Sequence, residues 1–137
     1  MTQEYDFDQA QTILDSSTTQ AEGILGNTAQ VDDILNQAQA RLADLPAAAG
    51  EALSNVPLMA NMIKGYVTGE YKVVSPKVVA SMLGALLYLV KGKDIIPDSI
   101  PILGLVDDVA VVALALKLNE QELADFKAWQ EAGSPQA

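Results

Sequence analysis

Two long apolar segments in the second half of the chain constrain its fold more than any other feature. The first, residues 76–91, begins with Ser75 as a hydroxyl N-cap and Pro76 at the first helical position. It is apolar on nearly every face, so other helices must surround it. The exceptions recur at steps of four, three, four and three, as one stripe of Lys77, Ser81, Gly84, Tyr88 and Lys91. The second segment, residues 105–118, has no polar residue from Val109 to Leu116.

The spacing of apolar residues predicts amphipathic helices that could cover these two segments. A first helix is predicted over Asp6–Glu22, a second from Asn27 until Pro46 stops it, and a third from Asn55 until Gly69 ends it. The first helix has a thin apolar face and is predicted to fray or to contact a partner. A short helical turn is expected over residues 47–53.

The ends of these helices carry recognisable capping patterns. Asn27 and Asn119 are each followed three residues later by Gln30 or Glu122, as in a capping box. Asn55 is the expected N-cap of the third helix, and Asn119 that of a last helix. The inner face of that last helix is predicted to include Leu123 and Phe126, with Trp129 or Gln130 beside them.

Together these patterns predict an all-α fold, a small bundle of five to six helices around a central apolar hairpin. The hairpin consists of the helices at about 76–91 and 105–118. Residues 1–70 form an acidic amphipathic region, and residues 71–133 form the hairpin plus the C-terminal helix, all in one folded unit. Small residues are expected to let the two hairpin helices approach closely: Ala80, Ser81, Gly84, Ala110 and Ala113.

Composition excludes several classes of function. The chain has no cysteine and no histidine, so zinc–thiolate sites and Ser-His or Cys-His catalysis are excluded. Its net charge of −10 repels phosphate backbones, which predicts no nucleic-acid partner. The N-terminus lacks the basic and apolar regions of a signal peptide, so a cytoplasmic protein is expected.

The stretch between the apolar segments combines helix breakers with apolar and acidic residues. Pro97 and Pro101 interrupt the helix, and Gly104 can adopt a left-handed turn. The isoleucines between them predict a loop that folds back onto the helices. Four carboxylates lie at this end of the hairpin: Asp94, Asp98, Asp107 and Asp108.

These four aspartates have two interpretations. The preferred one is structural, because Asp94 and Asp98 can accept backbone N–H bonds in turns, and Asp107 and Asp108 favour the first turn of a helix. The alternative is a hard-cation site for Mg²⁺ or Ca²⁺, since carboxylates without nitrogen or sulfur ligands suit these ions. The preferred interpretation predicts no cofactor and no catalytic residue.

The segment from Tyr88 to Asp108 resembles the signature of the YkvA-like family, a domain of unknown function numbered 1232. Two prolines, one glycine and four aspartates agree in register with that pattern, although Lys91-Gly92 stands where Ser-Pro is usual. The resemblance covers residues 74–118. It implies a small helical protein of a family with many members predicted to lie in membranes. No catalytic residue carries over, and the four aspartates are the only site candidates.

The apolar segments are short for membrane spans. At 1.5 Å per residue they reach ~24 Å and ~21 Å, against a hydrocarbon core of ~30 Å, so a soluble bundle is the expectation. A membrane-inserted hairpin is the alternative. We therefore predict a non-enzymatic helical interaction or structural module with a protein partner, self-association or a membrane as its target. A metal-dependent activity at the aspartates is the other alternative, and no small-molecule substrate is predicted.

Overall fold

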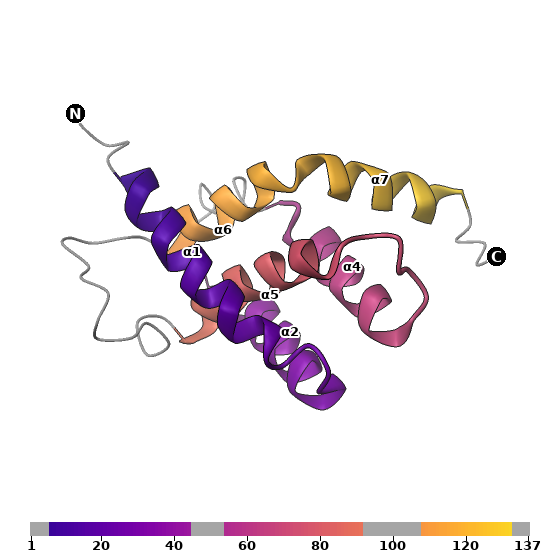
Figure 1. Cartoon of the computed structure of the whole chain (residues 1–137), viewed down its shortest axis with the longest axis horizontal. Coiled ribbons are helices and arrows are strands. Elements are labelled where there is room, and N and C mark those ends of the chain that lie inside the picture. The colour runs from indigo at the N-terminus through magenta and orange to yellow at the C-terminus, as the bar shows by residue number, and fades with distance from the viewer. Residues whose placement is uncertain (1–5, 45–53, 92–107, 133–137) are drawn as a thin grey trace.

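The computed structural model describes residues 6–44, 54–91 and 108–132 (Figure 1). Helix is the only regular secondary structure in these ranges, which confirms the predicted all-α fold. The described helices are α1 (Asp6–Glu22), α2 (Thr28–Ala43), α4 (Val56–Thr68), α5 (Pro76–Lys91), α6 (Asp108–Leu118) and α7 (Glu120–Glu131). The helical turn predicted over 47–53 and the start of the second apolar segment at 105–107 lie outside the described residues.

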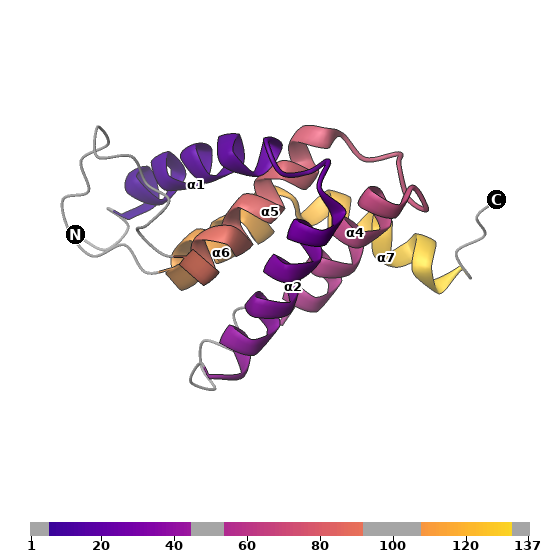
Figure 2. The ribbon, with the colours of Figure 1, turned by 90° about the horizontal axis from the view of Figure 1, so that it is seen from below.

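Helix α5 is the centre of the bundle. It is buried continuously from Met82 to Leu89, as its apolar composition predicts. Helices α1, α2, α4 and α6 all pack against it, with α1 crossing it and α6 lying alongside (Figures 1 and 2). Its predicted start is confirmed, because the Ser75 hydroxyl oxygen accepts a hydrogen bond from the Lys77 backbone N–H at 3.1 Å.

Helices α2 and α4 lie side by side on another part of α5 (Figure 2). The predicted apolar stripe of α2 is buried: Val31, Ile34, Leu35 and Ala38. Its predicted cap is present, since the Asn27 side chain accepts a hydrogen bond from the Gln30 N–H at 3.1 Å. Helix α4 ends as predicted at Gly69, which has a φ of 91° that favours glycine.

The predicted side-chain caps at Asn55 and Asn119 are wrong. Both residues occupy N-cap positions, but neither makes a side-chain capping hydrogen bond. The buried Asn119 amide instead donates to the Ala115 carbonyl at 2.8 Å and to the Ser81 hydroxyl at 3.0 Å. Asn119 therefore ties the end of α6 to α5, because a buried amide must satisfy its hydrogen bonds wherever partners lie.

Helix α1 differs from its prediction, which was that it frays or contacts a partner. Its residues Ala10, Ile13, Leu14 and Ala21 are almost fully buried. The apolar face, although thin, is therefore already used within this chain. Gly84 was expected to bring the hairpin helices together, but its closest neighbours outside α5 are backbone atoms of α1.

The hydrophobic core joins buried residues from α1, α2, α4, α5, α6 and α7 in one cluster. The predicted division of the chain at residue 70 stays a prediction. None of the helices in the described ranges is both long enough and apolar enough to cross a membrane.

Candidate functional site

The aspartates predicted as site candidates lie almost entirely outside the described residues. Asp94, Asp98 and Asp107 fall in the range 92–107, and Asp108 is the first residue of α6. Both the capping and the Mg²⁺ or Ca²⁺ interpretations therefore stay predictions. Among the side chains that the structure does describe, no group of three or more metal-ligating residues is placed to hold an ion.

Helices α1 and α5 approach each other closely at Gly84. A Cβ added to Gly84 would lie 2.7 Å from the Ser17 carbonyl carbon and 2.7 Å from the Thr18 backbone nitrogen. Real Cβ atoms do not approach backbone this closely, so only glycine fits at this position. Helix α1 therefore lies backbone-to-backbone on the middle of α5.

Two hydroxyl side chains of α1 are buried beside this crossing. Thr18 donates to the Leu14 carbonyl at 2.7 Å, which satisfies its hydroxyl within the helix. Ser17 is fully buried, and its hydroxyl has no hydrogen-bond partner. A buried polar group without a partner costs about 1–3 kcal/mol, so Ser17 weakens the contact that it helps to form.

The part of α5 around Gly84, where α1 packs, forms a defined surface. With 3.6 residues per turn, six other residues of α5 lie within about 60° of Gly84 around the helix axis, and together with Gly84 they make up one face. We call them the Gly84 face: Lys77, Ala80, Ser81, Gly84, Leu87, Tyr88 and Lys91. The middle of this face is buried, whereas Lys77 and Lys91 at its two ends are exposed.

The Gly84 face contains the stripe of exceptions that was recognised in the sequence of α5. Lys77 and Lys91 are exposed, Ser81 is half-buried beside Asn119, and Gly84 and Tyr88 are buried. The sequence did not reveal that another helix covers the stripe. Ser81 and Gly84 did predict a close helix contact, because small residues permit one, but that contact was assigned to the other hairpin helix.

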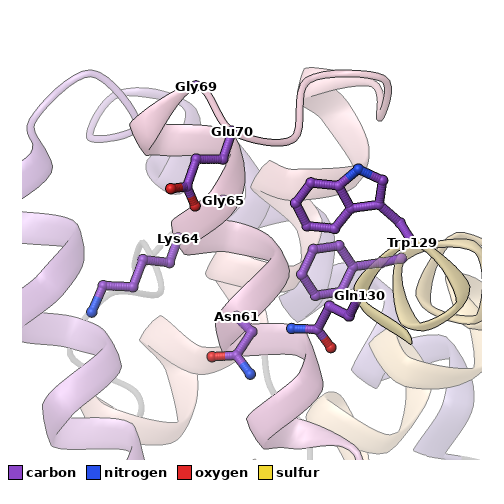
Figure 3. A pocket seen from close by; sticks show the side chains of 8 residues that line it. Asn61, Lys64, Gly65, Gly69, Glu70, Trp129 and Gln130 are labelled. Carbon is purple, nitrogen blue, oxygen red and sulfur yellow. The ribbon is translucent and has the colours of Figure 1, made fainter. Parts of the chain in front are cut away.

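A hollow of about 490 Å³ opens between α4, the turn after it and α7 (Figure 3). Its walls include the rings of Phe126 and Trp129, which stack at 5.5 Å between centroids. The Lys64 side chain extends away from the Trp129 ring, and the Asn61 amide does not point toward the Gln130 amide (Figure 3). These polar groups do not converge on one point, so the hollow offers no evident catalytic arrangement.

Tyr71 packs against these two rings, at 4.8 Å from each centroid. Burial raises the pKa of its phenol above the usual value, and the negative charge of Asp125 adds to this effect. Tyr71 is therefore a neutral anchor for α7 at physiological pH.

A second hollow, of about 440 Å³, lies where α4, α6 and α7 meet. Lys117, Lys127 and Glu120 line it together with apolar residues such as Leu116 and Leu123. Its charges are of mixed sign and come from exposed side chains. Neither hollow presents a paired acid and base or a nucleophile with a base beside it.

Taken together, these features define a small helical protein built around one apolar helix that four others cover. The sequence profile of the family described as "Protein of unknown function (DUF1232)" matches residues 78–114, which include most of α5 and all four predicted aspartates. The "Uncharacterized membrane protein YkvA" of Bacillus subtilis (strain 168) is 31% identical over 80 residues, which are 58% of this chain and 76% of that relative. The chain belongs to this YkvA-like DUF1232 family. No solved structure is significantly similar to it.

Proposed function

We propose that this protein is a non-enzymatic helical module that associates with a membrane. The observation that carries the proposal is the relative from Bacillus subtilis, whose description is that of a membrane protein and most of whose length this chain matches. The family profile covers most of the two apolar helices α5 and α6. The missing cysteines and histidines favour a role without catalysis.

The lysines of α5 support contact with lipid headgroups. The chain is acidic overall, but the charge is uneven, at −8 over residues 1–70 and −2 over residues 71–137. Helix α5 itself carries two lysines and no acid. A lysine can extend its apolar stem along a hydrocarbon surface and keep its ammonium group among phosphates.

A vesicle flotation experiment tests the proposal. Full-length protein is mixed with vesicles of phosphatidylcholine, with and without phosphatidylglycerol, and centrifuged through a density gradient. We expect the protein to float with the vesicles, and to be enriched in the membrane fraction of cells. Protein that stays at the bottom with both kinds of vesicle and in the supernatant of broken cells would contradict the proposal.

A carbonate wash of the membrane fraction then separates two modes of association. Release by carbonate indicates binding at the membrane surface, which we expect. Retention in the pellet indicates the inserted hairpin that the sequence left as an alternative. A protein partner, the other predicted target, would retain the protein on cell membranes but not on protein-free vesicles.

A further inference from the structure

We propose that the Gly84 face of α5 is the lipid-binding surface, and that α1 is a displaceable cover which leaves this face when the protein meets a membrane. This inference rests on the proposed membrane association. It adds the surface that binds, the chemistry of the occupant and an autoinhibitory role for α1.

The Gly84 face has the pattern of a helix that lies in a bilayer interface. Ala80, Gly84 and Leu87 form an apolar strip, and Tyr88 adds an aromatic ring with a polar end. Lys77 and Lys91 bound the strip, 14 residues and ~21 Å apart along the helix. Both lysines lie within about 20° of Gly84 around the axis, so they could reach phosphates while the strip faces hydrocarbon.

The contact that holds α1 on this face contains a buried polar group without a hydrogen-bond partner. The fully buried Ser17 hydroxyl has no partner, and the Ser17 backbone lies against Gly84 of α5. Release of α1 would give this hydroxyl access to water and so recover part of its hydration. Release would also expose Ile13 and Leu14, which are buried in the covered state. The covered state is therefore favoured in water, and another apolar surface is needed to replace α1.

The charges of α1 and α5 should make an anionic membrane stabilise the uncovered state of the protein. The sequence of α1 contains four acidic residues and no basic one, whereas α5 contains two lysines and no acid. Anionic headgroups repel α1 and attract the ends of the Gly84 face. A ligand shifts a conformational equilibrium by its difference in affinity for the two states, and here the surface distinguishes them by charge.

Two substitutions in α1 should move this equilibrium in opposite directions. Ser17→Ala removes the unsatisfied hydroxyl and stabilises the cover, whereas Leu14→Ala removes buried apolar contact and loosens it. Thr19→Ala is the matched control, because Thr19 is exposed on the same helix. None of these variants changes the Gly84 face.

The experiment measures two quantities for each full-length variant: hydrogen–deuterium exchange of α1 amides without lipid, and partition onto phosphatidylcholine vesicles that contain phosphatidylglycerol. We expect Leu14→Ala to raise exchange and partition by roughly tenfold or more. Ser17→Ala should lower both by up to about tenfold beyond the effect of Thr19→Ala, which measures the small gain in helix propensity that the two substitutions share. Wild-type α1 should lose its protection when vesicles are added, while α5 keeps its own.

A lysine variant tests the binding face separately. Lys77→Glu combined with Lys91→Glu should reduce partition onto the anionic vesicles at least tenfold and leave α1 exchange without lipid unchanged, since both side chains are exposed. This variant and Ser17→Ala remain informative if Leu14→Ala fails to fold. Partition that does not depend on these lysines would overturn the assignment of the face.

The outcomes separate this inference from the proposed function. If wild-type protein binds neither kind of vesicle and is absent from the membrane fraction of cells, the proposed function fails and this inference fails with it. If it is found on cell membranes but binds no vesicle, membrane association stands and the lipid-binding face is refuted. If wild-type protein binds but α1 stays protected on vesicles, or the Ser17 and Leu14 variants do not shift partition in opposite directions, membrane association stands and the cover is refuted.

Discussion

The helices at the two ends of the described chain, α1 and α7, are attached to the bundle in different ways. Helix α1 lies on α5 through a close backbone approach at Gly84 and Ser17. Helix α7 is attached to α4 and the following turn through large rings, with Tyr71 and Phe126 meeting edge to face at 4.8 Å and Phe126 stacked on Trp129.

This difference predicts opposite sensitivities to mutation. An aromatic anchor gains stability from buried area and loses it when a ring is truncated. A close backbone approach depends on shape, so it is disrupted when a side chain is enlarged. Two helices of one small bundle are therefore destabilised by different kinds of substitution.

The largest expected effect is at the α7 anchor. Phe126→Ala should reduce the free energy of unfolding by about 3–5 kcal/mol, because it removes a ring that is 2% exposed. Urea unfolding followed by fluorescence of Trp129, the single tryptophan, measures this loss. The control is the exposed neighbour Lys127→Ala, expected within about 0.5 kcal/mol of wild type. A loss as small as that of the control would show that the rings do not hold α7.

Enlarging the α1 contact should have the next largest effect. Gly84→Ala places a Cβ against the backbone of Ser17 and Thr18 and should cost about 1–3 kcal/mol. Gly26→Ala is the control, since nothing lies within 4 Å of its added Cβ, and no destabilisation is expected there. Urea unfolding measures the free energy of unfolding of both variants. Equal stability of the two variants would contradict the close approach and remove the contrast with α7.

The smallest effect appears only at high pH and concerns the α7 anchor alone. The pKa of Tyr71 is raised in the folded protein by burial and by Asp125, so the neutral phenol contributes stability below the ordinary pKa of about 10. That contribution is lost as pH rises through the raised folded value. Tyr71→Phe should therefore lose less stability than wild type above about pH 10, as thermal unfolding across pH can show. Parallel losses in the two proteins would exclude Tyr71 as their source.

Local patterns predicted much of the fold. The apolar stripe of α2, the Ser75-Pro76 start of α5 and the glycine end of α4 each depend on neighbouring residues in the chain, and each is confirmed. Asn119 shows where this reasoning stops. Its position fits an N-cap, but its amide is used by Ser81, which is 38 residues away in the sequence. Local spacing cannot reveal such a partner.

The Gly84 face could also be predicted only in part. The stripe from Lys77 to Lys91 could be recognised from its helical spacing, and the family relationship from the proline and aspartate register of residues 88–108. The sequence could not show that α1 packs on this stripe. It also could not show that Ser17 is buried there without a hydrogen-bond partner.

Periodicity and helix-end chemistry are properties of short stretches of chain, so the amino-acid order was sufficient to establish an all-α protein with one helix that needs cover on every side. Which helix covers which face depends on which of several apolar surfaces pack best against one another, and the shape of the backbone decides this. The folded bundle places α1 on the Gly84 face because glycine leaves room there for another backbone. The sequence of α5 shows the glycine, but it does not show which helix packs against it.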